Sequence, residues 1–575
     1  MHYAQLSEAY YEIESTSKRL EKTRIIARLF QEAGTNVSRV ALLLQGRVRP
    51  AWQKETMGVS GRLMLKALAR VTGASTQELE RSWSKQGDLG LVAQQHITGR
   101  SQQTLFTQQL SVEHVHEQLK RLATIEGRRS QDTKLKIISE LLSHAEPLDA
   151  RYITRTVLEE LRIGIASGTL RDAIIYAFLA SEAGIEEEEI VDREAYNRVS
   201  EAVQSAYDKT NDFAHVAVTA RKGLANIREV RIQVGTPIKV MLGYKGTTAT
   251  QALQDLGSPL LFQFKYDGFR VEIHKQGRDV QIFTRRLEDV TEQFPDIVEA
   301  VRSCVDAQQC ILDAEAIGVD VQTGKYKPFQ HVSQRIRRKY DIASVAEQLP
   351  VDVRVFDLLY LDGEEFLSKP LTKRHEQLQV IISDSERFGV AQTCITSDAA
   401  AAEEFFVQAL SGGAEGLFAK KLSSEYQPGT RVGNWVKLKD TMEPVDVVVT
   451  GAEWGEGKRS GWFTSFDIAI RDEEANLLAV GKVATGLKEL SEQGFSFEEI
   501  TALIKPLIEY EEGRHVSLKP EIILEVAYEE IQKSPSYESG YALRFPRILR
   551  NRTDERSVED ATSLEYLEQL YEQQS

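Results

Sequence analysis

The sequence contains only three cysteines in 575 residues, namely Cys304, Cys310 and Cys394. So few and so scattered a set excludes a disulfide framework, and the spacing does not match that of a zinc site. We therefore expect three free thiols, buried or half-buried, in a protein of a reducing compartment.

Long apolar runs are missing as well. A helix that spans a membrane needs about 18 or more consecutive apolar residues, and the sequence has no such window. The first eight residues lack a basic region followed by an apolar stretch, so we expect no secretory signal. Together with the free thiols, these absences predict a cytoplasmic protein that does not bind a membrane.

An excess of basic charge is also absent. Lys and Arg number 71 and Asp and Glu number 86, which gives a formal net charge of −15. This balance excludes a uniformly basic coat for nucleic acid, although local patches of Lys and Arg could still bind phosphates. The basic run at 335–339 fits a solvated face as well as it fits a phosphate-binding patch. A second run near the C-terminus comprises Arg544, Arg547, Arg550, Arg552 and Arg556.

The chain is long enough for three or four domains, since a typical domain holds roughly 150 residues. Through about residue 230, apolar residues recur at helical spacing. No cluster of polar residues converges in this half, which favours a binding or scaffold region over a catalytic one. We predict an all-α region over residues 1–232. Helices are expected at 112–126, 133–144, 153–163 and 170–183.

From about residue 235 the apolar period becomes that of strands, and Gln276-Gly277 is typical of a hairpin turn. This pattern predicts an α+β domain over residues 233–440. Its strands are expected at 261–283, 310–319, 351–361 and 415–421.

After residue 440 the strands become short, and residues 441–575 are expected to form a small β-barrel of the oligonucleotide-binding type. One helix is predicted at 498–509, and another ends the chain after residue 558. The strands are expected at 445–451, 462–470, 477–483 and 522–528.

The segment Phe264-Lys265-Tyr266-Asp267-Gly268-Phe269-Arg270 is the candidate for covalent chemistry. In a strand, Gln263 and Lys265 share one face, while Phe262 and Phe264 share the other. A lysine amine has a free pKa of about 10.4, so desolvation, neighbouring cations or a metal must lower it before the amine attacks phosphorus. The pattern K-x-D-G is short, and a surface lysine in a hairpin would explain it equally well.

Further polar segments follow in order along the chain. Asp313 and Glu315 would share one face of a strand, so both carboxylates could enter one pocket. Lys437 and Lys439 would likewise share one face. Taken singly, each segment also fits a solvated strand face, core packing or surface charge. The segments are Phe283-Thr284-Arg285-Arg286, Leu312-Asp313-Ala314-Glu315-Ala316, Val355-Phe356-Asp357-Leu358-Leu359-Tyr360, Ala414-Glu415-Gly416-Leu417-Phe418-Ala419-Lys420 and Trp435-Val436-Lys437-Leu438-Lys439.

This ordered series resembles the motifs of the nucleotidyltransferases that form lysyl-nucleotide intermediates, which comprise DNA ligases, RNA ligases and mRNA capping enzymes. The resemblance implies that Lys265 is the catalytic nucleophile and carries AMP from ATP. It implies that Phe356 stacks on the purine, and that Glu315 binds the ribose or a metal. Mg²⁺, or another divalent ion such as Mn²⁺, would bind at Glu315 and Glu415. The implied nucleotide contacts are Gln263, Arg270, Arg285, Glu315, Phe356, Arg431 and Lys437.

The rest of the chain narrows the resemblance to ATP-dependent DNA ligases of the archaeal type. The stretch from Tyr528 to Arg547 resembles the last motif of these enzymes, and Leu161-Arg162-Ile163-Gly164-Ile165-Ala166-Ser167-Gly168 resembles part of their DNA-binding domain. The implied order is a helical DNA-binding domain (1–232), an adenylation domain (233–440) and an OB-fold domain (441–575). A monomer associated with the nucleoid would seal nicks in duplex DNA during replication, repair and recombination.

The sequence departs from the family pattern in two places. Many relatives carry Glu where this chain has Gln263, so base choice can differ, and some relatives accept NAD or ADP beside ATP. The family ending R-x-D-K is replaced by Arg552-Thr553-Asp554-Glu555-Arg556, which leaves the role of Arg556 open. Separately, Gln102-Gln103-Thr104-Leu105-Phe106 resembles a peptide that binds a sliding clamp, although a polar loop with Phe106 in the core explains it equally well.

Three other functions compete with this one. An RNA-end ligase or capping enzyme is the nearest, but the long helical half and the Arg544–Arg547 context argue against it. An NAD-dependent ligase is disfavoured because a four-cysteine zinc module is missing. A DNA-binding scaffold without activity is disfavoured because Lys265, Glu315 and Lys437 are all present.

Overall fold

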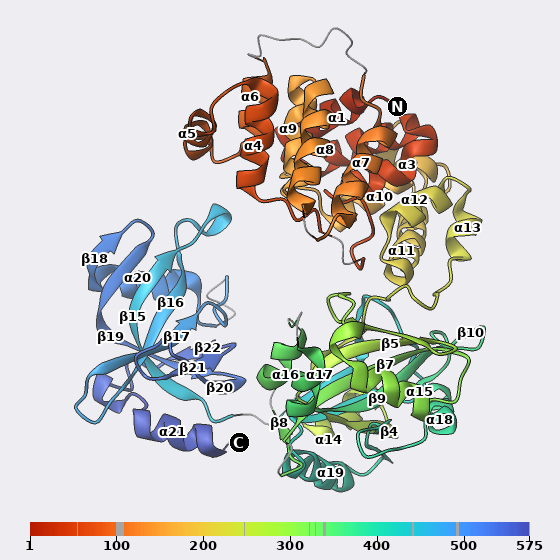
Figure 1. The fold of residues 1–575 in the computed structure, drawn as a ribbon. Helices are drawn as coiled ribbons and strands as arrows, with labels where there is room; N and C mark the ends of the chain where they lie inside the picture. The colour runs from red at the N-terminus through yellow and green to blue at the C-terminus, as the bar shows by residue number, and fades with distance from the viewer. Residues whose placement is uncertain are drawn as a thin grey trace. The chain divides into compact units, whose positions relative to one another are not determined.

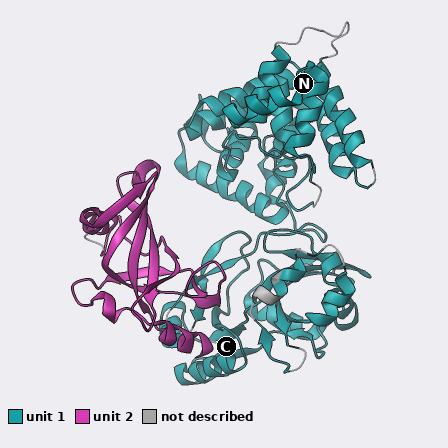
Figure 2. Ribbon diagram, turned by 60° about the vertical axis from the view of Figure 1, so that its left-hand side comes forward, with its two compact units in different colours: residues 1–439 teal, residues 440–575 magenta. Residues whose placement is uncertain are grey.

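The computed structural model has helices in its N-terminal part and sheets in the remainder (Figure 1). The chain divides into two compact units, residues 1–439 and residues 440–575 (Figure 2), and each is described by itself. The predicted clamp-binding segment Gln102–Phe106 lies outside the described residues. The structure describes residues 1–53, 56–98, 109–127, 129–246, 248–320, 323–327, 329–336, 338, 341–439, 442–489 and 494–573.

Residues 1–228 of the first unit are almost entirely helical, as predicted, and share one apolar core. Serine side chains cap several of the helices; Ser60 accepts a hydrogen bond from the Leu63 backbone N–H, and Ser111 accepts one from His114. The helices are α1 (Tyr3–Ser15), α2 (Arg19–Glu32), α3 (Val37–Leu43), α4 (Gly61–Thr72), α5 (Thr76–Gln86), α6 (Leu89–Thr98), α7 (Val112–Thr124), α8 (Ser130–His144), α9 (Pro147–Val157), α10 (Ser167–Phe178), α11 (Arg193–Thr210), α12 (Phe213–Ala220) and α13 (Leu224–Arg228).

Two helices of this region end earlier than the sequence predicted. The helix expected over 153–163 ends at Val157, because Glu159, Arg162 and Gly164 adopt positive φ angles that no α-helix accommodates. The helix expected over 170–183 ends at Phe178. Its continuation turns at Gly184 (φ 59°) into a short unpredicted hairpin of β1 (Ile185–Glu186) and β2 (Glu189–Ile190).

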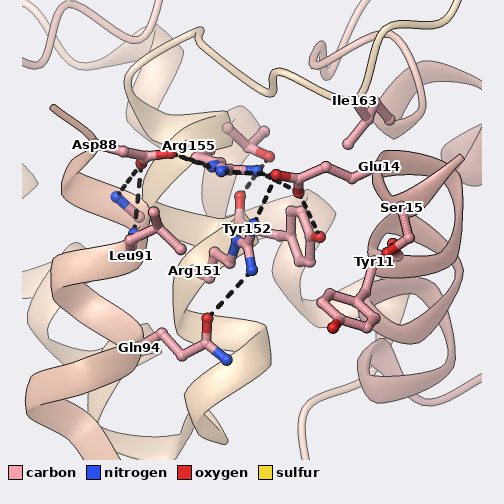
Figure 3. A network of polar contacts seen from close by, with 12 residues as sticks. Tyr11, Glu14, Ser15, Asp88, Leu91, Gln94, Arg151, Tyr152, Arg155 and Ile163 are labelled. Carbon is pink, nitrogen blue, oxygen red and sulfur yellow. Dashed lines mark hydrogen bonds and ion pairs between the residues drawn. The ribbon is translucent and has the colours of Figure 1, made fainter. Parts of the chain in front are cut away.

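A network of buried charges joins three parts of this helical region (Figure 3). The Arg155 guanidinium on α9 donates to Glu14 on α1 (Nη1–Oε2, 2.8 Å) and to Asp88 before α6 (Nη2–Oδ2, 2.6 Å). Arg151 and the Tyr152 hydroxyl also donate to Glu14, at 2.6 and 2.9 Å. Each buried charge therefore has an opposite charge beside it, which offsets its loss of hydration. The expectation that no polar cluster converges in this half was therefore wrong. The sequence did not reveal the cluster because its members lie up to 141 positions apart.

The rest of the first unit consists of two sheets with helices beside them. Within the described residues, a five-stranded sheet has the order β12-β4-β13-β14-β3, and a seven-stranded sheet has the order β10-β9-β7-β5-β6 with β8 and β11 added. The strands are β3 (Leu242–Lys245), β4 (Leu260–Lys265), β5 (Phe269–Gln276), β6 (Asp279–Thr284), β7 (Gln309–Val319), β8 (Tyr326–Lys327), β9 (Val351–Leu361), β10 (Glu364–Glu365), β11 (Phe388–Val390), β12 (Thr393–Thr396), β13 (Gly416–Lys421) and β14 (Arg431–Lys439). The helices are α14 (Ala249–Leu256), α15 (Pro295–Cys304), α16 (Phe329–Ile336), α17 (Ile342–Gln348), α18 (Leu371–Ile381) and α19 (Ala399–Ser411).

Alternation along the strands gives each sheet one apolar face and one more polar face. On β4, Phe262 and Phe264 enter an apolar core that includes residues of α14 and α19. On β5, Val271 and Ile273 enter a separate core on the seven-stranded sheet. The polar faces remain for chemistry. The α+β prediction, the strand at 351–361 and the turn after Gln276 are confirmed.

The second unit is rich in strands, and its principal sheet has the order β17-β16-β15-β19-β18 with β22 added. The helix predicted over 498–509 ends at Ile504, since Pro506 follows and lacks the N–H that a helix requires. Among the described residues, no helix is both long and apolar enough to cross a bilayer. The elements are β15 (Val445–Trp454), β16 (Phe463–Arg471), β17 (Leu477–Val483), α20 (Phe497–Ile504), β18 (Ile508–Glu512), β19 (His515–Ala527), β20 (Glu530–Lys533), β21 (Tyr541–Arg544), β22 (Arg547–Asn551) and α21 (Leu564–Gln573).

The three cysteines are free thiols, as expected. Cys310 is buried and the other two, Cys304 and Cys394, are half-buried. Burial raises the pKa of the Cys310 thiol to about 12, so it stays protonated at neutral pH.

Candidate active site

Lys265 is the last residue of β4, in the interior of the five-stranded sheet. Its ammonium forms an ion pair with the Glu415 carboxylate, and the Glu415 backbone N–H donates to the Lys265 carbonyl (2.7 Å). Only 16% of the Lys265 side-chain surface is exposed. The candidate nucleophile is therefore fixed at both its backbone and its amine.

The register of β4, β13 and β14 places more cations around Lys265. Gly416 lies opposite both Lys265 and Lys439, and Phe418 lies opposite both Gln263 and Lys437. Directly opposite residues project from the same face, so these side chains line one surface. Lys439 also contacts Glu415 (Nζ–Oε2, 3.1 Å), which thus bridges two lysines. Burial alone would raise the pKa of Glu415, but Lys265 and Lys439 hold it below its ordinary value.

The seven-stranded sheet contributes an anchored arginine. Arg270 on β5 donates through Nε to Asp313 Oδ1 (2.8 Å), forms a second bond from Nη2 to Oδ2, and donates to the Met241 carbonyl (2.7 Å). Asp313 is fully buried and also accepts from the Tyr426 hydroxyl (2.8 Å). Asp313 therefore orients Arg270 and is itself unavailable to a ligand.

Glu315 lies opposite Arg270 in the β5–β7 register. Burial raises the pKa of Glu315 to about 8, although Lys265 and Arg270 oppose this rise. Among the described residues it has no hydrogen-bond or ion-pair partner. A half-buried carboxylate without a partner, close to a second carboxylate at Glu415, is suited to receive a cation or a ribose hydroxyl.

Gly268 allows β7 to approach the turn that follows Lys265. A Cβ atom at this position would lie 2.5 Å from the Ala316 carbonyl oxygen and 3.0 Å from Glu315 Cγ. Any other residue would push the turn away from β7 and displace Lys265 relative to Glu315.

An aromatic ring and a buried lysine lie between the two sheets. The Phe356 ring on β9 is 5.3 Å from the Arg270 guanidinium carbon and 5.0 Å from Lys420 Nζ. The Lys420 amine is also 3.8 Å from the Trp435 ring and donates to Gln263 Oε1 (2.5 Å). Burial lowers the pKa of Lys420 to about 7. Phe356 is half-buried, which leaves part of its ring open for stacking.

The structure thus brings the predicted residues of both sheets into one site. Arg285 and Arg431 are exposed, and both are close enough to Lys437 to act on its pKa. The residues that sequence reasoning left without a role here are Lys420 and Tyr426, whereas Asp313, expected to enter the pocket beside Glu315, binds Arg270 and Tyr426 instead. The position of Lys420 five residues after Glu415, at the end of the quoted segment, could have indicated it, whereas Tyr426 carries no local signal.

The basic run at 335–339 is not a uniform phosphate-binding patch. Arg335 is only 1% exposed, and its guanidinium binds the Asp296 carboxylate at 2.6 and 2.9 Å. It also donates to the carbonyls of Gln293 and Leu349. Arg335 therefore fastens α16 to the first turn of α15, to Gln293 just before that helix and to the residue after α17, and it is unavailable to a ligand.

Several C-terminal arginines also have carboxylate partners in the second unit. Arg544 binds Glu530 (2.8 Å), and Arg550 binds Glu525 (3.0 Å). Arg556 approaches Asp446 only at 3.9 Å, and 42% of its side-chain surface is exposed, so its role stays open.

Comparison with known proteins identifies the family. Three family models match in order: DNA ligase N terminus over residues 2–175, ATP dependent DNA ligase domain over 240–439 and ATP dependent DNA ligase C terminal region over 459–555. The DNA ligase of Nanoarchaeum equitans is 42% identical, with 100% of this chain and 99% of the relative covered. That of Thermococcus fumicolans is 39% identical over 99% and 98%. The chain belongs to the ATP-dependent DNA ligases.

A solved structure called "Pmar-Lig_Pre." shares the fold of this ligase. It has a TM-score of 0.51 and 14% sequence identity, and the match covers 95% of the ligase and 98% of that chain. At this identity the likeness concerns the fold alone.

Lys437 gives the ligase a testable dependence on pH. Burial, reinforced by the nearby cations of Lys265 and Arg285, lowers the pKa of Lys437 to about 8. We predict that the charged form of Lys437 attracts the triphosphate of ATP; this attraction would be present below pH 8 and lost as pH rises through that value. We expect the KM for ATP in the covalent step to rise up to roughly tenfold per pH unit above about pH 8.

Lys437→Arg is the matched variant, because a guanidinium stays protonated throughout this range. Its KM for ATP is expected to remain nearly constant from about pH 7 to about pH 9. Identical pH profiles for the two proteins would show that Lys437 does not act on the triphosphate.

Proposed function

We propose that Lys265 is the amine through which this ATP-dependent DNA ligase takes up AMP. The observation that carries the proposal is its position: a strand-end lysine beside Glu415, on the face that also presents Lys437 and Lys439. The amine attacks the α-phosphorus of ATP, a P–N bond forms, and the bond to pyrophosphate breaks. Negative charge develops on phosphate oxygens, which these cations stabilise.

The remaining steps join the DNA strand. AMP passes from Lys265 to the 5′-phosphate at a nick in duplex DNA. The 3′-hydroxyl then attacks that activated phosphate, a phosphodiester forms, and AMP leaves. The ligase thereby serves DNA replication, repair and recombination.

The nucleotide is proposed to lie between the two sheets, with the purine stacked on Phe356. Gln263 lies near the base, and Arg270 and Glu315 lie near the ribose and the α-phosphate. Arg285, Arg431 and Lys437 would hold the phosphates. The short distances from Phe356 to Arg270 on one sheet and to Lys420 on the other support this arrangement, since they place the ring beside residues of both sheets.

Mg²⁺ fits the carboxylates of Glu315 and Glu415. Mg²⁺ is usually held by one or two carboxylates together with substrate phosphates and water, and the lack of a protein partner for Glu315 within the described chain agrees with that role. When bound, the ion would supply positive charge to the phosphate oxygens. Mn²⁺ prefers the same oxygen ligands.

We further propose the three-domain division suggested by the sequence. Residues 1–232 would bind DNA, residues 233–440 would carry out adenylation, and residues 441–575 would form an OB-fold. The principal sheet of the second unit, which has six strands among the described residues, supports a barrel-type domain. A cytoplasmic, nucleoid-associated monomer is the form proposed for the active enzyme.

The test maps the adenylate directly. The ligase is incubated with α-labelled ATP and Mg²⁺, digested, and analysed by mass spectrometry; a second sample receives nicked duplex DNA before digestion. We expect AMP on Lys265, and loss of that AMP together with sealing of the nick. Lys421→Ala, which removes an exposed lysine on β13, should label normally. Labelling of another side chain, with Lys265 unmodified, would refute the assignment.

A further inference from the structure

The Gln263 side-chain amide is unusual in this site because its nitrogen has no hydrogen-bond partner among the described residues. Its side chain lies on β4 and the residue is only 2% exposed. Oε1 accepts a hydrogen bond from Lys420 Nζ (2.5 Å), but Nε2 has no hydrogen-bond partner anywhere in the described part of the chain. Buried amide N–H groups are almost always paired, so an unpaired one in a binding site points to a ligand acceptor.

Lys420 decides which end of the amide faces the ligand. It is only 1% exposed and is held against the Trp435 ring at 3.8 Å. An ammonium group has donors and no acceptor, and a neutral amine still keeps two N–H donors. The Gln263 oxygen therefore turns toward Lys420, and the –NH₂ group is left for the bound nucleotide.

The position of Gln263 indicates that the acceptor for its –NH₂ group belongs to the purine base of the nucleotide. This step rests on the function proposed above. Gln263 and Lys265 are two residues apart on one strand face, or about 7 Å along the strand. Phe418, on the neighbouring strand, lies opposite Gln263, and Lys420 connects Gln263 to Phe356. A purine stacked on Phe356, with its α-phosphate at Lys265, thus presents a hydrogen-bonding edge to Gln263.

The two kinds of purine differ at that edge. Adenine has an amino donor at position 6 and an acceptor at N1, whereas guanine and hypoxanthine have an oxygen acceptor at position 6. A carboxylate, which only accepts, selects the adenine amino group and repels the 6-oxo group. An amide that offers –NH₂ meets an acceptor on either base.

We propose that Gln263, oriented by Lys420, lets the ligase use 6-oxopurine nucleoside triphosphates as nucleotide donors beside ATP. The covalent step is otherwise unchanged. The Lys265 amine forms the P–N bond to the α-phosphorus of ITP or GTP. The bond between that phosphorus and the bridging oxygen breaks, pyrophosphate leaves with the electron pair, and the amine proton passes to solvent.

The experiment compares α-labelled ATP, ITP and GTP as donors to the full-length ligase with Mg²⁺. It measures kcat/KM for the covalent labelling of the protein by each donor. ITP lacks the 2-amino group of guanine, so it tests the 6-oxo edge, with its oxygen and its N1–H, without that group. For the wild-type enzyme we expect kcat/KM for ITP within about tenfold of that for ATP. Gln263→Glu should raise the preference for ATP over ITP by roughly ten- to a hundredfold. Gln408→Glu, the same change at an exposed position on α19, should leave the preference unchanged.

The outcomes separate this inference from the function on which it rests. Labelling by ATP with a preference over ITP above roughly tenfold in the wild-type enzyme overturns the inference and leaves Lys265 as the nucleophile. No labelling of Lys265 by any of the three donors overturns the proposed function itself. Should Gln263→Glu fail to fold, the wild-type ratio of ITP to ATP still decides the question. A Gln263→Glu enzyme that uses ITP as well as the wild type does would also overturn the role of the amide.

Discussion

A Lys265→Ala ligase is expected to take up no AMP from ATP and yet to seal a nick whose 5′ end already carries an adenylate. The amine is the bond-forming atom only in the first step, whereas the last step needs the pocket and the DNA. Loss of the nucleophile should lower covalent labelling by roughly 10⁴-fold or more. Sealing of pre-adenylated DNA should stay within about tenfold of wild type, because Glu415 keeps Lys439 as its partner.

Two measurements check this result. Labelling with α-labelled ATP follows the first step, and single-turnover sealing of pre-adenylated nicked DNA follows the last. Lys421→Ala serves as the control for a lysine change on the adjacent strand. If Lys265→Ala failed on pre-adenylated DNA as completely as on ATP, Lys265 would have to act structurally or in every step.

Of the substitutions considered, Asp357→Ala is expected to lower the free energy of unfolding the most. Asp357 follows Phe356 on β9 and binds the Arg374 guanidinium of α18 through both oxygens, at 2.6 and 3.1 Å. Both side chains are 0% exposed. Removal of the carboxylate leaves a buried cation without its counter-charge, which costs about 3–5 kcal/mol. Because Asp357 fixes the strand that presents Phe356, the KM for ATP should rise as well.

The control is an exposed ion pair on the same helix, α18. Lys373 binds Glu376 with both side chains more than half exposed, so Lys373→Ala should cost between about 0 and 1 kcal/mol. Amide hydrogen exchange of peptides from β9 and α18 in the full-length protein measures both effects locally. Equal exchange rates in the Asp357→Ala and Lys373→Ala proteins would contradict the proposed role of the buried pair.

Local patterns in the sequence were enough to place the reactive side chains on the correct faces. Alternation predicted that Phe262 and Phe264 point away from Gln263 and Lys265, and the two phenylalanines do pack in a core. A period of two residues is written into the strand itself and needs no knowledge of its neighbours. The ends of helices were less certain, as at Val157, because a few positive φ angles outweigh helical periodicity.

The order of a helical region followed by sheet-rich regions, and the motifs of the family, were thus predicted correctly from the sequence alone, which also supplied the candidate residues of the site. The tertiary structure decided which charges pair: Lys265 with Glu415 across 150 positions, Lys420 with Gln263 across 157, and Arg270 with Asp313. It also decided that Arg335 is buried and that Arg155 joins Glu14 to Asp88. These pairs depend on strand order and helix packing, which bring distant residues together, and a local periodicity contains no information about either.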